Sequence, residues 1–202
     1  MKIRKTIDLF SLILSCLPFK VIDAVYVDGL KRLYRGQGDL TDSSNSGHAL
    51  TEFLRPGETG SVVTFPQDSP YPNNSQSRQV MSFKGTGKTI GSATGLPKSD
   101  SHRTIMGWFK RSSDIEVYGI FGYGKGGTCN KAFYFLLSQS IAIHLDYWCQ
   151  LEGVNPVAST TIIQWYHIAA AFDGTKNIIY VNGQWNVLCE PDELPDTDVG
   201  QE

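Results

Sequence analysis

Two glycine-containing turns near the end of the chain constrain its fold more than any other feature. Asp173-Gly174 separates two apolar segments, 165–172 and 176–181, and Asn182-Gly183 separates the second of these from 184–188. Both dipeptides favour a type I′ turn, because each central residue readily adopts positive φ, and such turns join neighbouring antiparallel strands. These residues therefore predict three consecutive strands of one antiparallel sheet.

The rest of the chain supplies further strand patterns and no helical pattern. No long segment has apolar residues at helical spacing, and Gly, Ser, Asn and Pro interrupt the polar stretches. Segment 104–110 alternates, so that Met106 and Trp108 share one face. Segment 165–172 is apolar on both faces, as in a strand buried between two layers. Further short strands are expected at 62–65, 80–83, 117–123, 132–138, 141–148 and 160–163. This spacing predicts an antiparallel sandwich or barrel.

Composition excludes several classes of function. Charged residues make up 19% of the chain, and its formal net charge is -2. This balance gives no electrostatic reason to bind nucleic acid or an acidic membrane surface. An apolar fraction of 41% is too high for a disordered chain.

The first residues have the pattern of a secretory signal. Three basic side chains within residues 2–5 precede an apolar stretch at 7–19, and Ala24 supplies a small residue for cleavage. The sequence thus predicts a signal peptide at 1–24, a mature domain at 25–202 and a secreted, extracellular protein. The apolar stretch is shorter than the ~20 residues of a membrane span, and the alternative is an uncleaved signal anchor. Asn73 begins an Asn-Asn-Ser sequon, a predicted glycosylation site in a secreted chain.

The mature domain contains three cysteines, which are Cys129, Cys149 and Cys189. An oxidising compartment favours a disulfide bond. A hairpin that turns at 138–140 places Cys129 opposite Cys149, within reach of a bridge. This register predicts a disulfide bond between these two residues and leaves the partner of Cys189 open. The alternative is a pair of buried free thiols.

The residues also resemble a known family. The resemblance covers almost the whole mature chain in family order, and its most specific part is the strand–turn–strand sequence at 165–183. Weaker matches lie at 28–30, 38–44, 80–87 and 104–110, the last being similar to a central tryptophan-containing strand. The chain is in this way similar to laminin-G-like domains of the concanavalin A-like lectin and glucanase superfamily. The resemblance implies an all-β fold, an antiparallel jelly-roll β-sandwich, and a chain that stops before the family's closing strands.

Relatives with this fold include glycosidases, which use paired carboxylates two residues apart on one strand. The nearest candidates are Glu190, Asp192 and Glu193, but Pro191 and Pro195 disfavour a regular strand there. These residues are better explained as a solvated acidic loop. We therefore expect no catalytic residues and no enzyme activity.

Some members of the family bind calcium through loop oxygens. Asp39, Asp42 and Asn45 place hard oxygen ligands close together in one loop, which suits calcium. The alternative is that these side chains form the turn itself. Calcium is the one candidate cofactor, and the turn is the favoured explanation.

The leading functional hypothesis is a secreted, non-catalytic binding or adhesion module, like a lectin, that recognises glycans or extracellular proteins through loops at its rim. It would belong to a longer parent chain with other domains. Candidate aromatic residues for stacking on sugars are Tyr118, Tyr123, Tyr147 and Trp148. The alternative, which is the more common case for each, is a place in the core or in a structural surface. Two alternatives are a structural domain of the extracellular matrix and a degenerate glycoside hydrolase.

Overall fold

The computed structural model describes residues 29–44, 46–57, 59–70, 78–83, 87–112, 118–125, 127–138, 142–147, 151–152 and 158–189. Every regular element within these residues is a β-strand, so the predicted all-β, antiparallel class is confirmed. The strands are β1 (Thr51–Phe53), β2 (Val63–Thr64), β3 (Ser82–Phe83), β4 (Lys88–Ile90), β5 (Arg103–Lys110), β6 (Tyr118–Gly124), β7 (Ala132–Leu137), β8 (Ala142–Asp146), β9 (Leu151–Glu152), β10 (Ala158–Ser159), β11 (Trp165–Phe172), β12 (Asn177–Val181) and β13 (Gln184–Cys189).

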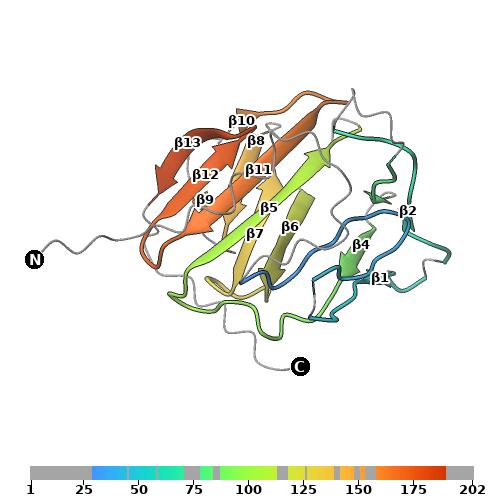
Figure 1. Ribbon diagram of the computed structural model, residues 1–202, viewed down its shortest axis with the longest axis horizontal. Helices are drawn as coiled ribbons and strands as arrows, with labels where there is room; N and C mark the ends of the chain where they lie inside the picture. Colours follow the sequence, from blue (N-terminus) through green and yellow to red (C-terminus); the bar gives the residue numbers. More distant parts are fainter. Residues whose placement is uncertain are drawn as a thin grey trace, which may run out of the picture. The chain divides into compact units, whose positions relative to one another are not determined.

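One layer is a four-stranded sheet with the order β13-β12-β11-β5, in front in Figure 1. Asn182 and Gly183 have φ of 52° and 77°, so the predicted type I′ geometry joins β12 to β13. The same prediction for Asp173-Gly174 is wrong, because only Gly174 has a positive φ, of 91°. The ladder instead ends at the pair Phe172 and Asn177, which leaves a four-residue loop. The Asp173 carboxylate holds this loop by accepting hydrogen bonds from the backbone amides of Thr175 and Lys176.

The second layer is a five-stranded sheet with the order β10-β8-β7-β6, in which β9 also pairs with β8. Strands β9 and β10 pair with different parts of β8, so together they act as one interrupted edge strand. Two predictions fail here. Segment 160–163 is a loop, since strand pairing ends at Ser159. The β7–β8 ladder pairs Leu137 with Ile143, a register two residues away from the one that would oppose Cys129 and Cys149.

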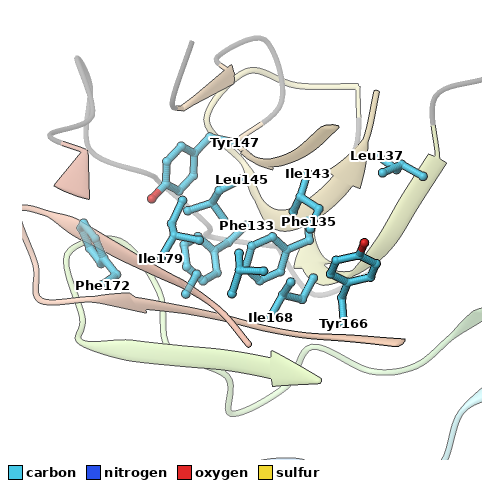
Figure 2. Close-up of a cluster of buried hydrophobic side chains, with 12 residues drawn as sticks. Phe133, Phe135, Leu137, Ile143, Leu145, Tyr147, Tyr166, Ile168, Phe172 and Ile179 are labelled. Carbon is cyan, nitrogen blue, oxygen red and sulfur yellow. The ribbon is translucent and has the colours of Figure 1, made fainter. Parts of the chain in front are cut away.

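The core lies between the two sheets, as in a β-sandwich (Figure 2). Strands β7 and β8 contribute Phe133, Phe135, Leu137, Ile143 and Leu145, and Tyr147 follows directly after β8; β11 and β12 contribute Tyr166, Ile168, Ala170, Phe172, Ile179 and Val181. These residues alternate along each strand, which is the period that a pleated strand imposes. Each large apolar side chain buried in this way stabilises the fold by about 1.5–3 kcal/mol.

Inward-facing positions of β5 fit the same core. Ile105 and Phe109 pack against it, and a Cβ atom on Gly107 would lie 3.0 Å from the Phe121 ring. The glycine therefore makes room for an aromatic side chain of β6. Arg103, which is 5% exposed, occupies the end of this row with its guanidinium over the rings of Phe133 and Phe172.

Two small sheets complete the described elements. β2 pairs with β3, which confirms a short strand within the predicted segment 62–65, and β1 pairs with β4. The sequence patterns missed β1 and β4, because each has three residues and one half-buried side chain. The predicted signal peptide and the expected loss of closing strands concern residues 1–24 and those beyond Cys189, outside the described part of the chain.

Candidate functional site

The outward side of the four-stranded sheet collects the tryptophans. Trp108 in β5, Trp165 in β11 and Trp185 in β13 all lie on this side, and the fourth tryptophan, Trp148, is outside the described residues. We call this surface the tryptophan face. It is made of Met106, Trp108, Trp165, His167, Tyr180 and Trp185. The four-stranded sheet that carries it lies in front in Figure 1.

Strand register aligns these side chains in rows. Met106 pairs with Ala169, Ala169 with Tyr180, and Tyr180 with Trp185, so one row crosses all four strands. Met106 is 43% exposed and Trp185 is 63% exposed. The ladder shifts beside Trp185, between Ile179 and Tyr180, and a bulge of this kind bends an edge strand.

The neighbouring row pairs Trp108 with His167. The two rings meet edge to face, with their centroids 5.1 Å apart, and Trp108 is 37% exposed. Burial lowers the pKa of His167 from its usual value, so the imidazole is neutral at neutral pH. The His167 backbone is fixed by two bonds to Asn182, whose side-chain oxygen accepts from its amide and whose own amide donates to its carbonyl.

Two charged side chains, Lys110 and Asp68, flank one end of the tryptophan face and are paired with each other. Lys110 forms an ion pair with Asp68 and lies over the Trp165 ring. The Trp165 indole donates to the same carboxylate over 3.3 Å. Desolvation opposes ionisation of Asp68, but the hydrogen bonds from Lys110, the Ser69 amide and Trp165, together with the charge of Lys110, outweigh it and lower the pKa of Asp68. The remaining side chains of the tryptophan face are uncharged.

The aromatic residues that the sequence suggested for sugar stacking do not form this surface. Tyr147 is fully buried, and its hydroxyl donates to the Asn177 side chain over 2.6 Å. Tyr123 packs against Phe133 and donates to a backbone carbonyl. The suggestion for Tyr147 is wrong, because its side chain lies in the core. Tyr123 packs against the core but is only partly buried, so its role in stacking stays a prediction. Nothing is described of the side chains of Tyr118 and Trp148.

Sequence reasoning could identify part of the tryptophan face. Alternation already placed Met106 and Trp108 on one side of β5. In the same way, Trp165 and His167 are two residues apart and so lie on one side of β11. The expectation that β11 is buried on both sides is wrong, since Trp165 and His167 are half-buried. The alternation could not show which side of β5 or β11 faces the solvent, because both sides of each strand carry apolar residues.

In the predicted calcium loop, the two described carboxylates, Asp39 and Asp42, accept hydrogen bonds from the protein itself. One oxygen of Asp42 accepts from the amides of Leu33 and Ser44, and the other accepts from the Ser46 hydroxyl and, over 3.3 Å, from the His48 amide. Partial burial opposes ionisation, yet these bonds hold the pKa of Asp42 well below its usual value. The carboxylate therefore organises the loop by itself.

Asp39 has a similar local role, since it accepts from the amide and the hydroxyl of Thr41. Asn45 lies outside the described residues. Within the described chain, no three His, Cys, Asp or Glu side chains are grouped as metal ligands. Calcium binding at Asp39, Asp42 and Asn45 stays a prediction, with the turn as the better-supported explanation.

The remaining predicted sites fall partly outside the described chain. Cys129 is disulfide-bonded, but Cys149 lies in the segment between β8 and β9 that is not described, so their pairing stays a prediction. Asn73 and the acidic residues 190–193 also lie outside the described part.

Taken together, the two packed antiparallel sheets define a β-sandwich protein, with an exposed aromatic surface on one layer. The fold is similar to that of domain 4 of AbnA, a GH43 extracellular arabinanase from Geobacillus stearothermophilus, whose structure was solved in complex with arabinotriose. The TM-score is 0.56 at 14% sequence identity, and the match covers 79% of this chain and 74% of that domain. At this identity the likeness establishes the sandwich fold and is not specific to laminin G domains.

Comparison of the sequence with known proteins does not assign the chain to a family. No model of a known protein family matches the chain, and a search of curated proteins finds no significant match. Within the described residues, no helix is long and apolar enough to cross a membrane.

Proposed function

We propose that the chain is an extracellular, non-catalytic module that binds glycans through the tryptophan face. The observation that carries this proposal is the exposure of Trp185 and Trp108 in a sheet whose other side supplies the core. Tryptophan presents a large, rigid apolar ring and a polar N–H, and it is enriched at binding surfaces. Sugar rings offer apolar C–H faces between hydroxyl groups, which suits stacking on exposed indoles.

Two further observations support a glycan over another ligand. The fold is similar to a domain solved with arabinotriose, and the sequence resembles laminin-G-like domains of a superfamily that includes lectins. Fold likeness alone does not identify a ligand. The arrangement of exposed indoles is therefore the stronger argument.

The chemistry of the tryptophan face favours binding over catalysis. Glycoside hydrolysis requires two carboxyl groups that flank the scissile bond. The carboxylate beside the described tryptophan face is that of Asp68, and it is engaged by Lys110 and Trp165. The signal-like sequence at 1–24 supports an extracellular location, where polysaccharides and glycoproteins are available as ligands.

The test is a glycan array that contains neutral and acidic glycans and arabinotriose, followed by titration calorimetry with the best ligand. We expect binding by the wild-type protein and a loss of about tenfold in affinity for Trp185→Ala, since an aromatic contact of about 1.4 kcal/mol corresponds to a tenfold change in the dissociation constant. Ile163→Ala is the matched control, because Ile163 is 70% exposed but lies outside the tryptophan face.

Two results would overturn the proposal. One is an array with no bound glycan. The other is a monomer–dimer equilibrium that Trp185→Ala abolishes while glycan binding is absent, which would make the tryptophan face a contact between copies. Analytical ultracentrifugation of both variants distinguishes these outcomes.

A further inference from the structure

The dimensions and charge of the tryptophan face restrict the kind of glycan that it can accommodate. Trp108 and Met106 lie on β5 at one edge of the sheet, and Trp185 lies on β13 at the other. Between them, β11 contributes the small side chain of Ala169 and β12 contributes Tyr180. Large exposed side chains thus stand at both edges, and a buried alanine lies between them.

The distance between these edges follows from sheet geometry. Three strand spacings of about 4.8 Å separate β5 from β13, or about 14 Å, which is roughly the length of three linked sugar rings. A ligand that contacts both edges must lie across the strands. A single sugar can contact only one edge at a time.

The charge of the tryptophan face also restricts the class of glycan that it can bind. The rows Met106–Ala169–Tyr180–Trp185 and Trp108–His167 contain no Asp, Glu, Lys or Arg, and the next row pairs Trp165 with Lys110. The Lys110 ammonium at the end of the face already pairs with Asp68. A sulfated or uronic acid polymer would therefore find no free cation among these rows, and burying its charge without a partner is unfavourable.

We infer that the tryptophan face binds a neutral, linear oligosaccharide that lies across the four strands, with one edge at Trp108 and Met106 and the other at Trp185. This inference rests on the proposed function and names its ligand class. It implies that affinity depends on chain length up to the span of the sheet and changes little beyond it.

The experiment uses titration calorimetry of the purified protein with xylo-, cello- and manno-oligosaccharides of increasing length, from the monosaccharide to the hexasaccharide. Heparin and galacturonate oligosaccharides of matched length serve as the acidic series. We expect the affinity for a neutral series to rise steeply up to about three units and then to level off. Added salt should leave this affinity unchanged, because no ion pair is formed.

Variants at the two edges sharpen the test. Trp185→Ala and Trp108→Ala should each reduce affinity for the hexasaccharide by about tenfold or more and leave monosaccharide binding nearly unchanged. Ile163→Ala should retain the wild-type length dependence. Circular dichroism of each variant confirms that the fold is intact.

Separate outcomes distinguish this inference from the proposed function. Salt-sensitive binding of the acidic series, or equal affinity for a monosaccharide and a hexasaccharide, overturns the inference while the glycan-binding function stands. An absence of binding to every glycan of the array and of both series overturns both.

Discussion

The imidazole of His167 packs edge-on against the indole of Trp108, with an angle of 61° between the ring planes. The contact joins neighbouring strands β11 and β5 at a directly opposed pair of residues. Cross-strand aromatic pairs of this kind stabilise a sheet by roughly 0.2–1 kcal/mol. The pair also fixes the orientation of an exposed indole, so a single contact links stability to the proposed binding surface.

The first prediction concerns the pH dependence of stability. Burial lowers the pKa of His167 in the folded protein below the value of 6.5 that applies to an unperturbed histidine. The unfolded chain therefore binds the proton first as the pH falls, and the free energy of unfolding should decrease below pH 6.5. Urea denaturation from about pH 8 to about pH 5, above the titration of most carboxylates, measures this slope.

His167→Gln is the variant that tests the assignment, because glutamine does not titrate. The variant should have a shallower slope over the same pH interval. An unchanged slope would show that another group is responsible.

The second prediction concerns Asp42. Asp42→Ala removes the acceptor of four protein donors around one loop. We expect the free energy of unfolding to fall by about 2 kcal/mol, since loss of a charged acceptor leaves partly buried donors unsatisfied. Asp39→Ala should cost less, because Asp39 is exposed and bonds only to Thr41. Chemical denaturation of both variants gives the comparison.

The same variants test calcium binding. If Asp42 serves only the turn, a chelator should leave the melting temperature of the wild-type protein unchanged. A rise in melting temperature with added calcium that Asp42→Ala abolishes would support the metal site instead.

The third prediction concerns Arg103, which is buried between Phe133 and Phe172. Its guanidinium also donates to the Ser101 carbonyl and the Tyr123 hydroxyl. Arg103→Ala should lower the free energy of unfolding by about 3 kcal/mol, because it removes charged hydrogen bonds and leaves a cavity. Arg103→Lys should recover only part of this loss, since an ammonium cannot stack flat between two rings. Equal stability of Arg103→Ala and the wild type would contradict this role.

The fourth prediction concerns the disulfide bond of Cys129. We expect peptide mapping by mass spectrometry under non-reducing conditions to find Cys129 linked to Cys149. A bridge that closes a loop of about 20 residues should stabilise the fold by roughly 3 kcal/mol in the chain-entropy model. The melting temperature should therefore fall on reduction. A peptide that links Cys129 to Cys189 would refute the pairing.

The sequence by itself determined most strands of the two packed sheets and one of their turns, but not β9 and β10. Asn182-Gly183 forms the predicted turn, and the segments of β5, β7 and β11 lie where alternation and apolar runs placed them. These features are local, because the conformation of a dipeptide and the period of a strand depend on neighbouring residues. By contrast, the loop at Asp173 is set by hydrogen bonds of its carboxylate, which compete with the two-residue turn that Asp-Gly favours.

Only the tertiary structure decided which side of each strand became the surface. Ile105 and Phe109 on one side of β5, and Met106 and Trp108 on the other, are all apolar, so alternation alone assigns neither side to the core. The choice depends on which residues meet the second sheet, where Phe121 fills the space over Gly107. Strand register then brought Trp185 into one row with Met106, although they are far apart in the sequence. Such long-range pairing depends on packing between layers, which no local pattern encodes.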